Sequence, residues 1–328
     1  MTALVRRARE GERTTRRHRL LALVAASAVA VSCSDHGQTG RSSERRTTAP
    51  AAAAVLGPGR LVAIGAHRTL YLTCVGSGRP TVVLEAGFPG DSQIWRDDQP
   101  QLGRSARTCA YDRAGLGNSL PRRGIHDAAA EVADLRRLLR AARLPGPYVL
   151  VGHSYGGMLT ELFAHEHADD TAGVVLVDAR GRDATRRQLV IWPRSAAPSV
   201  RRAVFRPVQD GVDLAAGEAL ARNVRTLGDT PLAVVTAGTH EDWHRVVPPT
   251  ARALDRLWTT MQDELAELSS DHVHVVAVRS DHFVQQRDGQ PDVVVRAVRA
   301  VVRAARIHGR LPPCRRLFSG DAQVRCRE

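Results

Sequence analysis

The chain has 328 residues, of which 43% are hydrophobic, which is enough apolar material for one large α/β core with an insertion. Its formal net charge of +13 comes from 47 basic residues, all of them arginine, set against 34 acidic ones. The arginines are scattered and lack interleaved aromatic residues, which make up only 4% of the chain, so nucleic-acid binding is disfavoured.

Residues 1–33 have the features of an export signal. A basic segment ends at Arg19, an apolar stretch covers 20–31, and Cys33 follows shortly after. That stretch is too short to cross a bilayer, which takes about 20 residues. The sequence therefore predicts a signal peptide. Residues 30–33 resemble a lipobox, which would make Cys33 the lipidated anchor of an exported protein at the membrane. An ordinary cleavage site at 28–30 is the alternative.

The next segments lead from a linker into a sheet. Residues 34–59 are rich in Ser, Thr, Ala, Gly and Arg without apolar periodicity, which predicts a flexible linker. Short apolar runs then predict an opening hairpin and two further strands. These runs cover 61–64, 69–75, 81–85 and 107–111. Asp112 and Arg113 follow the last run, and we interpret them as a structural ion pair rather than as catalytic charges.

A helix is predicted over 125–142, where apolar residues recur at helical spacing. The polar positions of this helix are expected to face water. They are Asp127, Glu131, Asp134 and Arg137.

The stretch Gly152-His153-Ser154-Tyr155-Gly156 has the pattern of a nucleophile elbow. An apolar run over 148–151 precedes it and a helix-compatible stretch over 158–167 follows, which gives a strand, a sharp turn and a helix. The turn would project the hydroxyl of Ser154 outward. Gly152 and Gly156 would remove side chains that otherwise collide with the neighbouring strand and helix.

The second half of the chain continues the alternation of strands and helices. A β-branched run over 173–177 ends at Asp178, and 180–230 shows no clear strand and is expected to form a small lid. Further strands are predicted at 231–236 and 273–278, and helices at 254–268 and 291–306, with 307–328 as a C-terminal tail.

Four stretches, in chain order, resemble the serine hydrolases of the α/β-hydrolase superfamily. They are Leu84 to Phe88, Cys109 to Ser119, the elbow at 152–156, and Ser280 to Phe283. The resemblance covers roughly residues 60–306 and is specific to the superfamily, not to a substrate. It implies an α/β-hydrolase fold, with a mostly parallel eight-stranded sheet and helices on both faces. It also implies an oxyanion hole made by the backbone N–H groups of Phe88 and Tyr155.

A serine nucleophile needs a base and a carboxylate that orients the base. His282 lies just past the last predicted core strand, where the superfamily places its base. The acid is either Asp178, after the strand that follows the elbow, or Asp242 or Glu241 after the next strand, and we favour Asp178. His153 and His240 have no comparable support. We interpret His153 as a filler of the elbow that points away from the nucleophile, and His240 as part of a polar turn.

Four cysteines remain once Cys33 is assigned to a lipid. None has the spacing of a zinc site, so no metal is expected, and no organic cofactor is implied. In the sheet of the superfamily the second and fourth strands are neighbours, which implies a disulfide between Cys74 and Cys109. Cys314 and Cys326 are predicted to close the tail.

The sequence thus predicts an exported hydrolase that cleaves a small or medium carboxylic ester through an acyl-enzyme at Ser154. Ser154 disfavours the epoxide hydrolase and dehalogenase branches, which need Asp at this position. A peptidase or a thioesterase would use the same residues. A non-catalytic binding protein on the hydrolase scaffold is the alternative from another class.

Overall fold

The computed structural model describes residues 58–65, 67–194, 208–209 and 211–327. The predicted signal peptide, Cys33 and the predicted linker up to residue 57 lie outside this part of the chain. Among the described helices, none combines the length and the apolar character that a membrane crossing requires.

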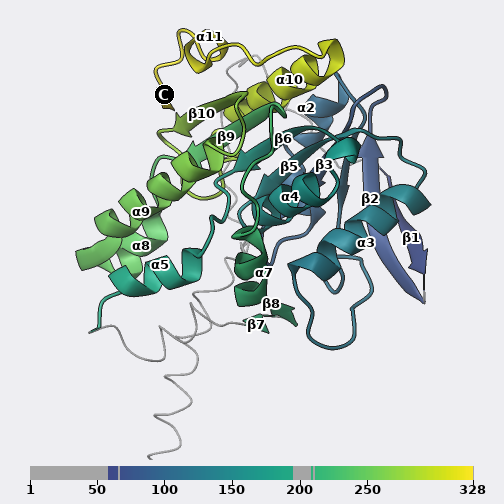
Figure 1. Cartoon of the computed structure of the whole chain (residues 1–328), viewed down its shortest axis with the longest axis horizontal. Coiled ribbons are helices and arrows are strands. Elements are labelled where there is room, and N and C mark those ends of the chain that lie inside the picture. The colour runs from purple at the N-terminus through teal and green to yellow at the C-terminus, as the bar shows by residue number, and fades with distance from the viewer. Residues whose placement is uncertain (1–57, 66, 195–207, 210, 328) are drawn as a thin grey trace, which may run out of the picture. The chain divides into compact units, whose positions relative to one another are not determined.

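A mostly parallel sheet forms the centre of the fold (Figure 1). Its strands are β1 (Gly59–Gly65), β2 (Arg68–Val75), β3 (Thr81–Glu85), β4 (Thr108–Tyr111), β5 (Tyr148–His153), β6 (Thr171–Val177), β9 (Leu232–Ala237), β10 (His272–Ala277) and β11 (Val324–Arg327). They lie in the order β1-β2-β4-β3-β5-β6-β9-β10-β11. The pairs β1–β2, β2–β4 and β10–β11 are antiparallel, and the others are parallel. The predicted fold class is confirmed.

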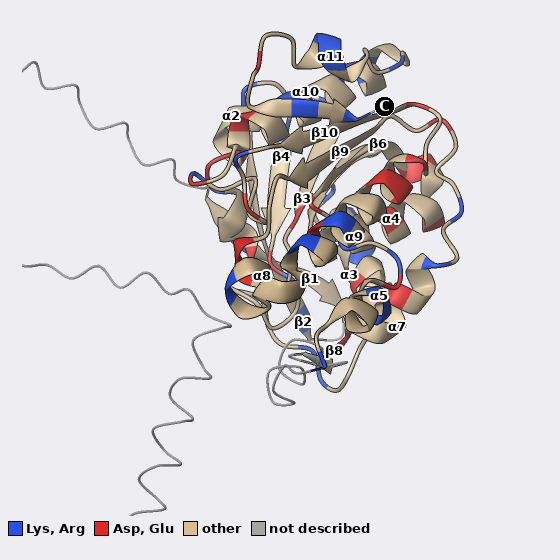
Figure 2. Cartoon of the chain, turned by 90° about the vertical axis from the view of Figure 1, so that its left-hand side faces the viewer, with Lys and Arg blue, Asp and Glu red and all other residues tan. Residues whose placement is uncertain are grey.

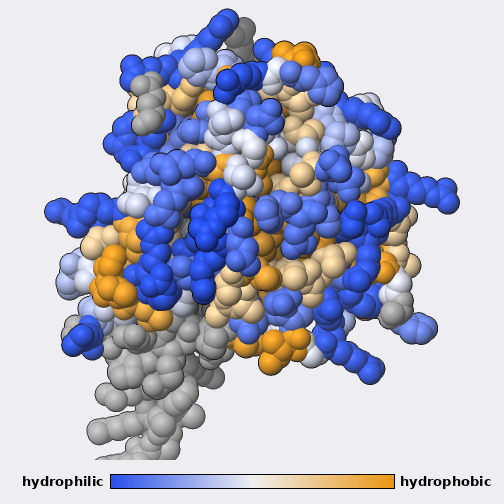
Figure 3. Space-filling view, in the orientation of Figure 1, coloured by the Kyte–Doolittle hydropathy of each residue, from blue (hydrophilic) through white to orange (hydrophobic). Residues whose placement is uncertain are grey.

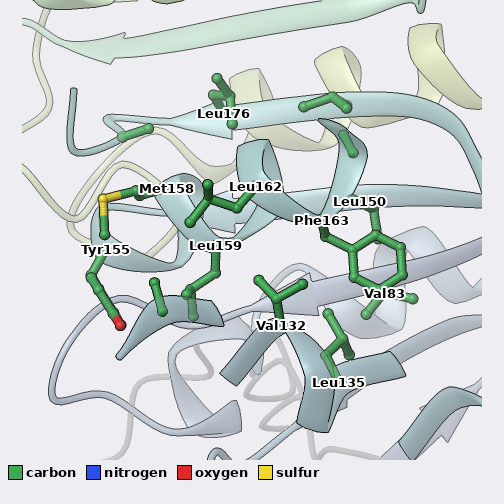
Figure 4. Packing of buried hydrophobic residues seen from close by; sticks show 14 of the residues in the cluster. Val83, Val132, Leu135, Leu150, Tyr155, Met158, Leu159, Leu162, Phe163 and Leu176 are labelled. Atoms are coloured by element: carbon green, nitrogen blue, oxygen red, sulfur yellow. The ribbon is translucent and has the colours of Figure 1, made fainter. Parts of the chain in front are cut away.

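Helices cover both faces of this sheet. They are α2 (Gln99–Gly103), α3 (Ala128–Ala141), α4 (Tyr155–Glu166), α5 (Ala184–Ile191), α7 (Leu214–Ala221), α8 (Glu241–Val246), α9 (Pro248–Ala266), α10 (Pro291–Ile307) and α11 (Cys314–Leu317). Side chains alternate along each strand, so Leu150 packs toward α3 and α4 while Val149 and Val151 pack toward α10. Figure 4 shows the first of these cores, in which Leu150 of the sheet lies beside Phe163 of α4.

The described part of the sheet has nine strands rather than eight, because the C-terminal tail supplies β11. Val324 and Cys326 of β11 pack against the core on the α10 side. The segment before β11 also contacts the loop that follows β10. The carbonyl of Gln323 accepts hydrogen bonds from the Val278 N–H at 3.1 Å and from Gln290 Nε2 at 3.0 Å. The tail is therefore part of the folded domain and braces the loop after β10.

Both predicted disulfides are present, Cys74–Cys109 and Cys314–Cys326. The first joins two residues that lie opposite each other on β2 and β4. The second fastens α11 to β11. The two bonds thus tie an edge region of the sheet and the C-terminal tail to the core.

The region expected to form a lid contains short elements. Besides α5 and α7 it holds a hairpin of β7 (Val208–Gln209) and β8 (Val212–Asp213), which the sequence analysis missed. Glu218 of α7 accepts hydrogen bonds from Arg180 Nε at 2.6 Å and from the Thr185 hydroxyl at 2.8 Å. These contacts join α7 to the start of α5. Residues 195–207 of this region lie outside the described residues.

Two predictions about polar residues near the core are wrong. Glu131 and Asp134 of α3 are each only 4% exposed and do not face water. Asp134 accepts hydrogen bonds from Arg68, which lies on β2, so a partner from elsewhere in the fold replaces water. Asp112 and Arg113 also do not pair with each other. The Asp112 carboxylate instead accepts N–H groups of its own loop and the loop after β3, while Arg113 turns to other acids.

Charged residues of both signs are interspersed over the side formed by α5, α7, α8 and α9 (Figure 2). In the view of Figure 3, apolar residues appear as small groups between hydrophilic ones. Basic residues are thus mixed with acidic ones on the side drawn in Figure 2, and no single large apolar patch is visible on the face shown in Figure 3.

Candidate active site

Ser154 lies at the sharp turn between β5 and α4, where the sequence predicts the elbow. Its backbone has φ 53° and ψ −120°, a strained conformation that a non-glycine residue adopts only where the surroundings enforce it. The Ser154 N–H donates to the Val177 carbonyl at 3.0 Å, and the Ser154 carbonyl accepts from the N–H groups of Gly157 at 3.0 Å and Arg180 at 2.9 Å. These bonds fix the turn from both sides.

The two elbow glycines are required by their surroundings. A side-chain carbon at Gly152 would lie 2.4 Å from the carbonyl oxygen of Gly156 and 2.5 Å from Thr160 Oγ1. A side-chain carbon at Gly156 would lie 2.3 Å from the carbonyl oxygen of Ala86. Because such separations are too short for carbon and oxygen, the elbow can pack between α4 and the end of β3 only with glycine at both positions.

The side chains of Ser154, His282 and Asp178 form a chain of hydrogen bonds. His282 Nε2 lies 3.0 Å from Ser154 Oγ, and His282 Nδ1 lies 2.6 Å from Asp178 Oδ2. Ser154 follows β5, Asp178 follows β6 and His282 follows β10 in the parallel part of the sheet. Carboxyl ends of parallel strands meet at one edge, and the three residues therefore converge there.

The alternative acids lie outside this cluster. Asp242 is on α8 with a side chain that is 73% exposed, and its carboxylate accepts a hydrogen bond from Arg245 at 3.0 Å. Glu241 is exposed beside it. Asp178 is therefore the carboxylate that contacts His282.

Asp178 is fully buried and accepts four hydrogen bonds. Oδ1 accepts from the Ala237 N–H at 2.9 Å and from Trp258 Nε1 at 3.0 Å. Oδ2 accepts from His282 at 2.6 Å and from His240 Nε2 at 2.9 Å. Burial by itself would raise the pKa of Asp178, but the two imidazoles outweigh it and hold the pKa well below its ordinary value. The carboxylate is ionised and cannot rotate.

The interpretation of His240 as an ordinary residue of a polar turn is wrong, because its ring shares an oxygen of Asp178 with His282. A sequence signal for this contact exists. His240 lies in the short loop after β9, which pairs in parallel with β6, so the residues that follow the two strands lie at the same edge. Trp258 was also missed, because it lies on α9 and reaches Asp178 only through tertiary packing.

His153 packs against His282, a contact that the sequence analysis did not predict. Its ring centroid lies 4.6 Å from that of His282, and its Nε2 lies 2.9 Å from the His282 carbonyl oxygen. Burial, with the nearby His282 second, lowers the pKa of His153 to about 3. The ring is therefore neutral and donates its Nε2–H to that carbonyl, which holds the backbone of the base.

The loop after β3 packs on the elbow, as the resemblance implies. A side-chain carbon at Gly87 would lie 2.5 Å from His153 Nδ1 and 3.1 Å from Ser154 Cβ. The rings of Phe88 and Tyr155 meet edge to face with centroids 6.1 Å apart. The two residues expected to supply the oxyanion hole are thus in contact with each other through their side chains.

Arg113 donates hydrogen bonds to the backbone of this loop. The residue is 3% exposed, and its Nη1 lies 2.7 Å from Glu85 Oε1. It also donates to the Ala86 carbonyl and, at 3.2 Å, to the Gly87 carbonyl. Burial raises the pKa of Glu85 to about 7 against the opposing effect of Arg113. The guanidinium therefore fixes both the end of β3 and the loop that carries Phe88.

Glu131 links α3 to the same network. It accepts a hydrogen bond from the Tyr155 hydroxyl at 2.6 Å and lies 3.5 Å from Arg113 Nε. Because Tyr155 is the residue after the nucleophile, this buried acid positions the start of α4. The contact explains why a carboxylate that the helical pattern assigns to the surface is buried.

Asp178, His240 and His282 also bring three metal-type donor atoms within 4.8 Å of one another, the only such group among the described residues. Both imidazole nitrogens already hydrogen-bond to the same Asp178 oxygen. We therefore interpret the group as a hydrogen-bonded acid–base cluster.

The fold and this site define an α/β-hydrolase with a Ser-His-Asp constellation. A model of the alpha/beta hydrolase family matches residues 82–297, and the chain belongs to that family. Among curated proteins, an uncharacterized protein YqjL of Bacillus subtilis is 28% identical over 224 residues, covering 68% of this chain and 83% of its own. The 2-hydroxy-6-oxo-2,4-heptadienoate hydrolase of Pseudomonas putida is 36% identical over 126 residues, covering 38% of this chain and 45% of its own.

Solved structures agree on the fold. A thermophilic esterase from Thermogutta terrifontis has a TM-score of 0.53 at 21% identity, covering 76% of this chain and 99% of its own. The haloalkane dehalogenase DatA from Agrobacterium tumefaciens has a TM-score of 0.55 at 18% identity, covering 78% and 100%. These structures support the fold, and the family match together with the curated hydrolase relative supports a hydrolase.

Proposed function

We propose that this protein is a serine hydrolase that cleaves a carboxylic ester through an acyl-enzyme. The observation that carries the proposal is the unbroken set of contacts from Ser154 Oγ to His282 Nε2, 3.0 Å, and from His282 Nδ1 to Asp178 Oδ2, 2.6 Å. A hydroxyl becomes an effective nucleophile when a base at this distance removes its proton during attack.

The reaction has two steps. Ser154 Oγ attacks the ester carbonyl while His282 Nε2 takes the hydroxyl proton, and His282 returns that proton to the departing alkoxide. The acyl group then remains on Ser154. A water molecule gives a proton to His282 and attacks the acyl carbon, and the carboxylic acid leaves as Ser154 regains its proton. Asp178 keeps His282 in the tautomer with hydrogen on Nδ1, which leaves Nε2 free as the base.

Negative charge on the carbonyl oxygen is stabilised by the backbone N–H groups of Phe88 and Tyr155. Tyr155 is the first residue of α4, so its N–H has no acceptor one turn earlier in that helix. Phe88 lies on the loop that Arg113 fixes against the elbow. Donors held in place before the reaction lower the barrier without reorganisation.

Labelling with a fluorophosphonate probe tests the proposal. We expect the wild-type protein to be labelled at Ser154, as identified by peptide mass spectrometry, and Ser154→Ala to lose the label completely. A series of p-nitrophenyl esters of increasing acyl length should then be turned over, with a preferred length that reports the depth of the acyl pocket. An unlabelled wild-type protein would instead support the binding-protein alternative. Faster turnover of peptidyl amides or thioesters than of oxygen esters would reassign the substrate class.

Export and anchoring through a lipid on Cys33 are a further part of the proposal. They are supported by the lipobox-like residues 30–33 and by two disulfides, a feature of proteins outside the reducing cytoplasm. In a bacterial host, we expect the full chain to fractionate with membranes and Cys33→Ala to appear in the soluble extracytoplasmic fraction. Equal membrane association of both proteins would contradict the anchor.

A further inference from the structure

His240 is held between two carboxylates. It follows β9 and precedes α8, and its side chain is 8% exposed. Nε2 lies 2.9 Å from Asp178 Oδ2, and Nδ1 lies 3.2 Å from Asp255 Oδ1 on α9. Since each carboxylate can only accept, both ring nitrogens must carry hydrogen to satisfy both contacts. The geometry therefore requires an imidazolium.

The surroundings of His240 agree with a fixed cation. Burial would lower the pKa of His240, but Asp178 and then Asp255 outweigh it and raise the pKa to about 9. Trp243 stacks on the ring with centroids 4.1 Å apart at 22°, and Trp258 meets it edge to face at 5.4 Å. An aromatic face attracts a cation and excludes water from it.

The carboxylate that orients His282 is thus shared. Asp178 Oδ2 accepts from His282 on one side and from His240 on the other. The two imidazole centroids are 5.9 Å apart. A positive charge at this distance offsets part of the negative charge that His282 experiences.

We propose that His240 is a positioning residue of the hydrolytic site, an imidazolium that Asp255 holds in place so that Asp178 stays aimed at His282 with part of its charge compensated. The role rests on the proposed serine hydrolase function. It extends the hydrogen-bonded chain to Asp255–His240–Asp178–His282–Ser154.

The compensation has a consequence for the pH range of the reaction. With His240 charged, less net negative charge faces His282. We therefore expect the acid limb of the kcat/KM profile to lie at lower pH than it would beside an uncompensated carboxylate.

The other titratable groups near the cluster make their hydrogen bonds to atoms other than Asp178 Oδ2. His244 pairs with the second oxygen of Asp255 at 2.7 Å, and Asp281 accepts the backbone N–H of His282 at 2.6 Å. His153 is neutral because its pKa is lowered to about 3.

The test is the dependence of kcat/KM on pH for a p-nitrophenyl ester, measured on the wild-type protein, His240→Gln and Asp255→Asn. Glutamine keeps an N–H donor but not the charge. In His240→Gln we expect the acid midpoint of the profile to move to higher pH by about 1 unit. The plateau should fall by about tenfold because Asp178 is less firmly held. Asp255→Asn should move the midpoint in the same direction by a smaller amount.

A second buried histidine, His274 of β10, also pairs with an aspartate of α9 and provides the matched control. His274 is 2% exposed and its Nδ1 lies 3.1 Å from Asp263 Oδ1, but it does not touch Asp178. His274→Gln should leave the acid midpoint where it is in the wild type. A purely structural role for His240 would make the two glutamine variants alike.

The results separate the two proposals. Wild-type protein that the fluorophosphonate does not label at Ser154 would overturn the serine hydrolase and, with it, the role of His240. Labelled protein with an unmoved midpoint in both His240→Gln and Asp255→Asn would overturn only the role of His240. If His240→Gln does not fold, the protonation of the two His240 ring nitrogens is measured instead by ¹⁵N NMR in the variant Ser154→Ala. Two protonated ring nitrogens at pH 7 support the proposal, and one unprotonated nitrogen refutes it.

Discussion

Asp178→Asn is expected to lower kcat/KM for an ester by about 10³- to 10⁴-fold. Both oxygens of Asp178 accept two hydrogen bonds each, so an amide NH₂ must face donors whichever way it turns. If the NH₂ faces His282 and His240, His282 must present an unprotonated Nδ1, so its hydrogen lies on Nε2 and that atom can no longer act as the base. If the NH₂ faces the Ala237 N–H and Trp258 Nε1, two donors that cannot move lie opposite another donor. Steady-state kinetics with an activated ester measures the loss, and denaturant unfolding shows whether the variant is folded.

Asp242→Asn is the matched control, because Asp242 is the other acid that the sequence allows. Its side chain is 73% exposed and contacts Arg245, so kcat/KM should stay within about twofold of the wild type. The assignment of the acid fails if Asp242→Asn is the slower of the two variants.

Arg113→Met is expected to destabilise the protein by about 3–5 kcal/mol, because it leaves two buried acids without their cation. The guanidinium lies 2.7 Å from Glu85 and 3.5 Å from Glu131. Methionine fills the volume but cannot replace these contacts or the bonds to the carbonyls of Ala86 and Gly87. The free energy of unfolding in denaturant measures the effect. The rate of fluorophosphonate labelling should also fall, since the loop that carries Phe88 loses its support.

An exposed arginine of α3, the helix that carries Glu131, provides the control for Arg113→Met. Arg137 is 55% exposed and pairs with Asp134 at 3.0 Å, so Arg137→Met should change stability by no more than about 0.5 kcal/mol. Similar losses in the two variants would show that Arg113 does not act as a buried counter-ion.

The elements of this fold could be predicted because their signals are local. A continuous apolar run marks β5, the pattern around Ser154 marks the elbow, and the helical stripe marks α3. The three residues of the proposed triad could be chosen because each follows a strand in a known chain order. The structure brings these three together as expected.

The polar partners could not be predicted because they are set by distant segments. Glu131 looks like a surface residue of α3 until Arg113 and the Tyr155 hydroxyl are brought beside it. His240 looks like a turn residue until β9 lies next to β6. Local periodicity cannot report such contacts. The contact of His240 with Asp178 could still have been suggested, because β9 and β6 are parallel neighbours that end at the same edge of the sheet.

The strand β11 was missed for a different reason. It is only four residues long and carries arginines at every second position, so it reads as a polar tail. Its alternation of Val324 and Cys326 with Arg325 and Arg327 is nevertheless the period of a strand with one covered face.

The Cys314–Cys326 disulfide has a consequence beyond the tail itself. It fastens β11, and Gln323 just before β11 accepts hydrogen bonds from Val278 and Gln290, which flank the loop that carries His282. A thiol reductant is therefore expected to loosen the surroundings of His282, although neither sulfur lies at the site.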